Sequence, residues 1–227
     1  MGTSKGYISP TRIQWTNAKR AVTQMLNDRD ASSTAKAISR FATAMKADTT
    51  PSSTFSKAAS VILGLSKLIS YSGTENALNQ INRQDLVGKS SEEIWNELLN
   101  EYTNNGSTKE DALAADALSK TLANLKIQDL EQLGQIKQDV LLLEMLSNYI
   151  SICFEFRYSE KIGKDRSPFE TAKIIREIQD YIRSNLYENL KLSDINAVDF
   201  FELSNSKYVD NALRDAYSVF ENLYVED

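Results

Sequence analysis

The stretch VLLLEMLSNYISICFEF, residues 140–156, decides the fold of this chain. Its first half is apolar on nearly every side of a helix, and Glu144, Asn148 and Glu155 interrupt it. A helix that is apolar all round is usually buried on all sides. The interruptions keep the stretch short of the roughly 18 apolar residues that a membrane span needs. We therefore expect residues 140–162 to form the central helix of a soluble bundle.

Helical spacing of apolar residues continues on both sides of this stretch, from Trp15 to Leu223, with no lasting strand alternation. Residues 167–170, SPFE, and residues 90–93, SSEE, are typical of capped helix starts. Gly73 is typical of a helix end. With 8 Gly and 3 Pro, the chain also lacks the turn residues that an all-β fold requires. The sequence predicts an all-α bundle of about eight or nine helices with a long, buried central helix.

Charge is distributed unevenly along the chain, whose net charge is −5. Residues 1–90 hold 12 Lys and Arg against 5 Asp and Glu, and residues 91–227 hold 14 against 26. We expect a flexible N-terminal arm over residues 1–14 and a single helical domain over residues 15–227. Within that domain residues 15–88 form a basic front and residues 89–227 an acidic rear, which could face different partners. Residues 48–53 form the best linker.

Several kinds of active site are disfavoured by composition. The chain has no histidine, which excludes the common zinc sites, Ser-His-Asp triads and histidine bases. The eight glycines form no phosphate-binding motif. The single cysteine, Cys153, lies in an apolar run and is interpreted as a buried hydrophobic residue. We predict no enzymatic activity, no catalytic or metal-binding residue and no cofactor. A carboxylate-based metal enzyme, using pairs such as Glu93/Glu97 or Asp111/Asp116, is kept as an alternative.

The N-terminal part offers the candidates for partner binding or modification. These residues are Gly2, Thr3, Ser4, Tyr7, Trp15, Lys19 and Arg20. Removal of Met1 would leave Gly2 as an unhindered amine, whereas the lipidation pattern fails at Gly6. No signal-peptide pattern is present, so we expect a cytoplasmic protein.

The basic residues of the front half also support an alternative function in nucleic-acid binding. They are Lys5, Arg12, Lys19, Arg20, Arg29, Lys36 and Arg40. Such side chains neutralise phosphates, and Tyr7 and Trp15 could stack on bases. Against this, the chain is acidic overall. On the central helix, Arg157 is expected to form a structural ion pair with Glu160.

Several short segments, taken in order, resemble one protein family. They are GTSKGY at residues 2–7, NAKRAV at 17–22, DLVGK at 85–89, NGSTKED at 105–111, IQDL at 127–130, and Arg157 followed by KIG at 161–163. This series resembles QatB, the B component of the Qat anti-phage defence system. The long proline-rich segment associated with the N-terminal part of the family is missing, so a shortened relative from another bacterial defence operon is an alternative.

The resemblance implies a non-enzymatic adaptor or sensor in a bacterial anti-phage system, acting through protein–protein interaction. The implied partners are an ATPase, a deazaguanine-synthase-like enzyme and a nuclease-like protein of the same operon. The catalytic residues of the system would belong to those partners, and none is carried over to this chain. Gly2 is implied to be either the acceptor of a modification or part of a docking site.

Overall fold

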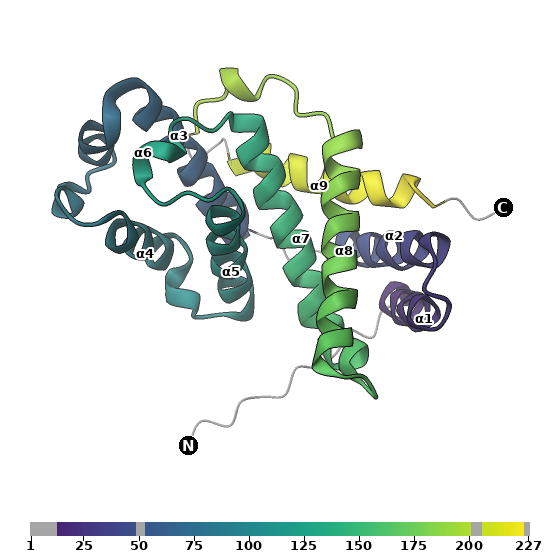
Figure 1. Cartoon of the computed structure of the whole chain (residues 1–227). Helices are drawn as coiled ribbons and strands as arrows, with labels where there is room; N and C mark the ends of the chain where they lie inside the picture. Colours follow the sequence, from purple (N-terminus) through teal and green to yellow (C-terminus); the bar gives the residue numbers. More distant parts are fainter. Residues whose placement is uncertain (1–12, 49–52, 201–205, 225–227) are drawn as a thin grey trace. The chain divides into compact units, whose positions relative to one another are not determined.

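The long apolar stretch forms helix α7, Gln138–Gly163, in a computed structural model that describes residues 13–48, 53–200 and 206–224. All residues from 141 to 151 are buried, so the predicted central buried helix is confirmed. Helices α3, α5 and α8 pack against α7 (Figure 1). Phe55 of α3 stacks on Tyr149 of α7, with ring centroids 4.1 Å apart.

The described residues divide into two units. Among the described residues, unit 1 comprises 13–48 and 217–224, and unit 2 comprises 53–200 and 206–216. The helices of unit 1 are α1 (Ile13–Asp28), α2 (Ala31–Ala47) and the end of α9 (Ser206–Asn222). Those of unit 2 are α3 (Ser53–Gln80), η1 (Gln84–Leu86), α4 (Ser91–Tyr102), η2 (Asn104–Gly106), α5 (Lys109–Asn124), α6 (Leu130–Leu133), α7, α8 (Pro168–Asn189), η3 (Ile195–Ala197) and the start of α9.

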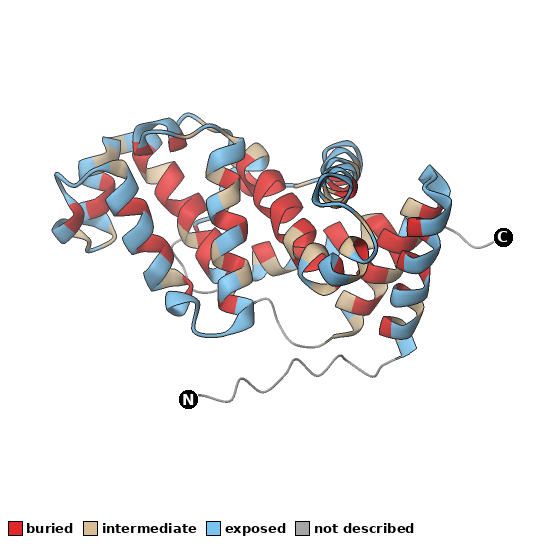
Figure 2. Ribbon diagram, turned by 60° about the horizontal axis from the view of Figure 1, so that its bottom comes forward, coloured by how far each residue is buried: buried red, intermediate tan, exposed pale blue. Residues whose placement is uncertain are grey.

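Within the described ranges, the chain has nine α-helices and no strand, which confirms the predicted all-α bundle. Figure 2 shows buried residues as stripes along the helices, with exposed residues on the opposite faces. That distribution is typical of amphipathic helices around a core. The prediction of a single domain over residues 15–227 stays a prediction, as does the arm, because residues 1–12 lie outside the described residues. The linker core, residues 49–52, lies outside them too.

Local sequence signals account for the starts of α4 and α8 in unit 2. Ser90 accepts a hydrogen bond from the Glu93 amide, and the Glu93 carboxylate accepts from the Ser90 amide. Ser167 and Glu170 form the same reciprocal pair, with Pro168 at the first helical position, where a missing N–H costs nothing. Both predicted capping boxes are therefore confirmed.

Two glycines shape the region around α3. Gly73 has φ +78°, a left-handed conformation that breaks α3 where a helix end was predicted. Gly134 follows α6 and lies directly against α3. A Cβ atom at Gly134 would lie 2.8 Å from the Ser70 amide nitrogen, closer than van der Waals contact allows. Nearby, Ser66 donates to the Leu133 carbonyl oxygen at 2.9 Å, which fixes α6 on α3.

The core of unit 1 is built on aromatic contacts. Trp15 of α1 meets Phe41 of α2 edge-on, with ring centroids 6.1 Å apart, and Tyr217 packs on Phe41 at 6.5 Å. Asp30 begins α2 by accepting a hydrogen bond from the Ser33 amide. The α1–α2 pair is thus a helical hairpin closed by the end of α9.

Candidate functional site

The candidates at the start of the chain fall outside the described residues. They are Gly2, Thr3, Ser4 and Tyr7, together with the basic residues Lys5 and Arg12. Modification at Gly2 and docking through the arm stay predictions.

The candidates on α1 lie on different faces of that helix. Lys19 and Arg20 are exposed, and we call these two residues the basic patch. Trp15 is 7% exposed and belongs to the core of unit 1, against Phe41. A partner or a base could stack on Trp15 only if that core opened. Of the predicted partner-binding residues on α1, the basic patch is therefore on the surface, and the aromatic residue Trp15 is not.

The remaining basic residues of the front half are less uniform. Arg29 is exposed between α1 and α2, whereas Lys36 and Arg40 are half-buried. The Lys36 ammonium lies 5.7 Å from the centroid of the Tyr224 ring, a cation–π distance. Part of the predicted basic surface is thus engaged within unit 1.

The second half of α7 carries the predicted ion pair. Arg157 is half-buried and Glu160 is exposed, and their pairing stays a prediction. Their neighbour Glu155 accepts a hydrogen bond from Gln179 of α8 at 3.3 Å.

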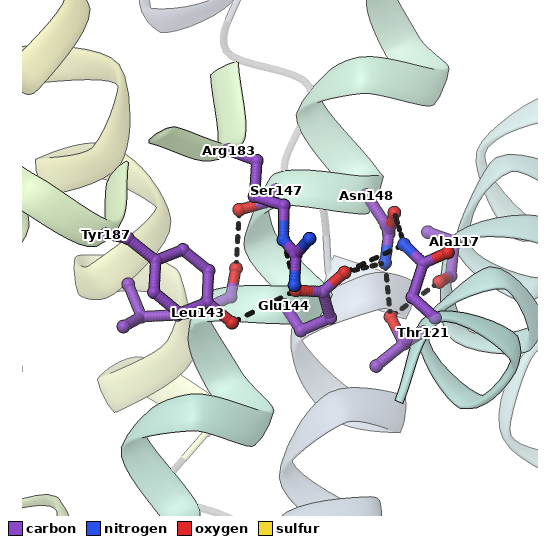
Figure 3. Close-up of polar contacts among 9 residues, drawn as sticks. Ala117, Thr121, Leu143, Glu144, Ser147, Asn148, Arg183 and Tyr187 are labelled. Carbon is purple, nitrogen blue, oxygen red and sulfur yellow. Dashed lines mark hydrogen bonds and ion pairs between the residues drawn. The ribbon is translucent and has the colours of Figure 1, made fainter. Parts of the chain in front are cut away.

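The most developed polar site of the described residues surrounds Glu144, in the middle of α7 (Figure 3). The Glu144 side chain is fully buried, and four donors from three helices reach its carboxylate. Asn124 of α5 donates to Oε1 at 2.8 Å, and Asn148 of α7 does so at 3.4 Å. Arg183 and Tyr187 of α8 donate to Oε2 at 2.9 and 3.0 Å. We call these five residues the Glu144 cluster.

These bonds engage the carboxylate completely. A carboxylate has about four acceptor positions, and the cluster supplies four donors. Asn148 also donates to the Thr121 hydroxyl at 3.1 Å, which extends the network into α5 (Figure 3). A metal ion or a substrate proton could reach Glu144 only by displacing a donor. The geometry therefore favours a structural role, in which Glu144 holds α5 and α8 against α7.

The negative charge of Glu144 affects the pKa values of Arg183 and Tyr187. Partial burial opposes the charge of Arg183, but the nearby carboxylate outweighs it, so the pKa of the guanidinium is raised. Burial raises the pKa of Tyr187, and the Glu144 charge raises it further. The Tyr187 hydroxyl therefore stays protonated at neutral pH and donates its hydrogen bond to Glu144.

A second buried carboxylate, Asp111, lies in the first turn of α5. It accepts hydrogen bonds from the Thr54 hydroxyl at 2.7 Å, from Asn104 and Ser107, and from the Thr108 amide. These bonds, led by the one from Thr54, hold the pKa of Asp111 well below its usual range. Asp111 thus ties the start of α5 to α3.

In each carboxylate pair of the metal-enzyme alternative, one residue forms structural hydrogen bonds and the other is exposed. Asp111 is engaged as above, and Asp116 is exposed. Glu93 caps α4, and Glu97 is exposed. In the portion of the chain that the structure describes, no group of three or more acidic or cysteine side chains is arranged to hold a metal ion.

The cysteine matches its interpretation as a buried hydrophobic residue. Cys153 is 3% exposed on α7, and burial raises the pKa of its thiol to about 12. A thiol with that pKa is almost entirely protonated at neutral pH and is a poor nucleophile.

Sequence reasoning recognised Glu144 only as an interruption of the apolar stretch. That interruption is itself a signal, because a carboxylate in a fully buried helix needs partners. The partners Asn124, Arg183 and Tyr187 come from helices 20 to 43 residues away. No local spacing in the sequence identifies them.

Comparison with known families agrees with the resemblance of the sequence segments. The model of a family described as Qat anti-phage system associated protein QatB matches residues 43–220, well over half of the chain. The segments at 85–89, 105–111 and 127–130 lie inside this match. No curated protein and no solved structure matches the chain. Among the described residues, no helix has the length and apolar character needed to cross a membrane. The chain belongs to the QatB family, whose members are associated with the Qat anti-phage system.

Proposed function

We propose that this protein is a non-enzymatic adaptor or sensor of the Qat anti-phage system, which assembles with the other proteins of its operon. Family membership is the observation that carries the proposal. The proposed partners are an ATPase, a deazaguanine-synthase-like enzyme and a nuclease-like protein.

The chemistry of the buried groups supports a non-enzymatic role. The carboxylates of Glu144 and Asp111 accept hydrogen bonds, several of which come from other helices. The thiol of Cys153 is buried and protonated. Two of these three buried groups are thus engaged in holding helices together, and the third is a poor nucleophile.

The basic patch supports a place for partner contact. Lys19 and Arg20 are exposed, while the opposite residues of α1, such as Ala18 and Val22, are fully buried. The patch is therefore held on a rigid, packed helix and can meet an acidic surface without a change of fold. Charge complementarity of this kind raises association rates and selects partners.

The test is co-expression of the full chain with its genomic neighbours, followed by affinity purification. We expect a stoichiometric complex with the ATPase or the synthase-like protein. Recovery of the chain alone, from cells that express all the neighbours, would refute the adaptor proposal. The intact mass of the same preparation reports on Gly2, because an unchanged mass would refute its modification.

Charge reversal tests the basic patch. The double variant Lys19→Glu/Arg20→Glu should lower complex recovery about tenfold or more, because it places like charges opposite an acidic partner. The control is Lys191→Glu/Lys207→Glu, which makes the same change of charge at two exposed lysines of unit 2. Equal recovery of both variants would contradict partner binding through the patch.

The nucleic-acid alternative is a separate outcome. It predicts that the chain alone binds single-stranded or duplex oligonucleotides and that this binding weakens steeply between low and moderate salt. Loss of that binding in the patch variant, without loss of the protein complex, would favour the alternative.

A further inference from the structure

The turn between α4 and α5 contains the one Asn-Gly pair of the chain, Asn105–Gly106. Asparagine is thermolabile because its side-chain amide can be lost, and a following glycine favours this reaction, since it has no side chain to hinder attack by its backbone nitrogen. Asn105 is exposed, and its side chain forms no hydrogen bond among the described residues. Water therefore has access to the most reactive asparagine of the chain.

The backbone of this turn has an unusual conformation. Asn104, Asn105 and Gly106 are consecutive residues with φ of +51°, +53° and +63°. Residues with side chains normally adopt the left-handed region singly, so a run of three that includes two asparagines is strained. The Gly106 amide closes the turn by donating to the Thr103 carbonyl oxygen at 2.9 Å. The turn keeps this conformation only because its surroundings hold it.

The buried carboxylate of Asp111 supplies this support. The Asn104 side chain donates to Oδ1 at 3.2 Å, and the Ser107 hydroxyl and the Thr108 amide donate to Oδ2, each at 3.0 Å. Asp111 is 3% exposed, and the Thr54 hydroxyl of α3 donates to it at 2.7 Å. The turn can open only when its hydrogen bonds to this fixed carboxylate break.

The closed turn blocks deamidation. The reaction requires the Gly106 nitrogen to attack Cγ of Asn105 and close a five-membered ring. That ring can form only when this nitrogen and the Asn105 Cβ lie on the same side of the Cα–C bond. At the observed ψ of +29°, the nitrogen lies on the opposite side. The exposed pair is thus held in a conformation that does not react.

We propose that Asn105 is a modification site that deamidates only when the α4–α5 turn opens, so that the product records the opening. In the open turn, the Gly106 nitrogen forms a bond to Cγ of Asn105, and the side-chain amide leaves as ammonia with the proton of the Gly106 amide. Water then adds to either carbonyl group of this succinimide and yields aspartate or isoaspartate. Water is the only co-reactant.

The isoaspartate product prevents the turn from closing as before. Its backbone runs through the former side chain and is one carbon atom longer, and it carries a new negative charge next to Asn104. A longer backbone cannot place both Asn104 and Ser107 on the Asp111 carboxylate. The change is irreversible because ammonia has left. This site is independent of the proposed partner contact through the basic patch.

Peptide mapping by mass spectrometry measures the reaction in the full chain, incubated at mildly alkaline pH in water labelled with heavy oxygen. The label enters only at residues that react during the incubation. A synthetic peptide of residues 99–112 gives the rate without the fold. We expect Asn105 of the folded chain to react between about tenfold and about a thousandfold more slowly than in the peptide, because only the open turn reacts. A rate equal to that of the peptide, or a slower rate than this range, overturns the proposal.

Asp111→Asn tests the support of the turn. The variant keeps the shape of the side chain and weakens the hydrogen bonds that it accepts, so Asn105 should react at least about fivefold faster than in the wild type. Asp116→Asn makes the same change at an exposed residue of α5 and should leave the rate unchanged. Equal rates in the two variants, both folded by circular dichroism, overturn the role of Asp111.

Ser107→Ala is the second variant, for use if Asp111→Asn does not fold. It removes one donor to Asp111 and leaves the Asn-Gly pair intact. Its rate is compared with that of a peptide carrying the same substitution, which corrects for any change in intrinsic reactivity. We expect less protection by the fold than in the wild type, and unchanged protection contradicts the proposal.

Hydrogen exchange tests the consequence of the modification. The isoaspartyl form carries an added negative charge, so ion exchange separates it from the unmodified chain. We expect the amides of Gly106 and Ser107, both hydrogen-bonded in the closed turn, to exchange faster in this form, while those of α7 keep their protection. Unchanged protection of the turn would show that the modification does not hold it open.

Discussion

Replacing Arg183 with methionine tests the structural role of the Glu144 cluster. Methionine keeps an unbranched apolar stem and removes the guanidinium. The substitution deletes the 2.9 Å ion pair with Glu144 and leaves a fully buried carboxylate with three donors in place of four. It also removes the cation–π contact between Arg183 and Tyr187, at 5.4 Å.

The size of the effect follows from the burial of the two partners. Breaking a fully buried ion pair costs about 3–5 kcal/mol. The Arg183 side chain is 51% exposed, so water partly replaces it, and the other three donors remain. A hydrogen bond to a charged group contributes about 1.5–3 kcal/mol. We therefore expect Arg183→Met to lower the free energy of unfolding by about 2 kcal/mol.

Urea unfolding followed by far-UV circular dichroism measures this change, with the slope of the transition compared between variants. Lys173→Met is the matched control on the same helix. Lys173 forms an exposed ion pair with Glu177 at 3.9 Å, which should contribute about 0.5 kcal/mol or less. If Arg183→Met costs no more than Lys173→Met, the cluster does not hold α8 on α7 and the reasoning is refuted.

Three further predictions follow from other packed groups. Gly134→Ala should lower the free energy of unfolding by about 1–3 kcal/mol, because the added Cβ meets the Ser70 backbone; wild-type stability in urea would contradict the close approach of α6 to α3. The pKa of Asp111 is lowered on folding, so its stabilising contribution is complete above its unfolded value of about 4 and declines as pH falls below that value. Asp111→Asn should therefore weaken this acid dependence in unfolding measured across pH, and an identical acid dependence would exclude the Thr54 bond as its source. Cys153 should react with a chromogenic thiol reagent only as fast as the protein unfolds, and fast labelling without denaturant would show that the thiol is accessible.

The sequence by itself determined the helices and most of their ends. Capping boxes such as Ser90–Glu93 and Ser167–Glu170 join residues three positions apart, so the local chain suffices to form them. The left-handed break at Gly73 is local in the same way. The burial of α7 was predictable because a helix without a polar face has nowhere to lie except inside.

Only the tertiary structure decided which side chains meet across the chain. The partners of Glu144 depend on how α5 and α8 are rotated about their axes and shifted along α7, and the packing of the core sets both quantities. Helical periodicity placed Trp15 on an apolar stripe, but burial against Phe41 removed it from the surface candidates. The hydrogen bond from the Leu130 amide to the Ser91 hydroxyl also joins segments about 40 residues apart. Hydrogen bonding within a turn is encoded in a few neighbouring residues, whereas contacts between helices depend on the packing of the whole core.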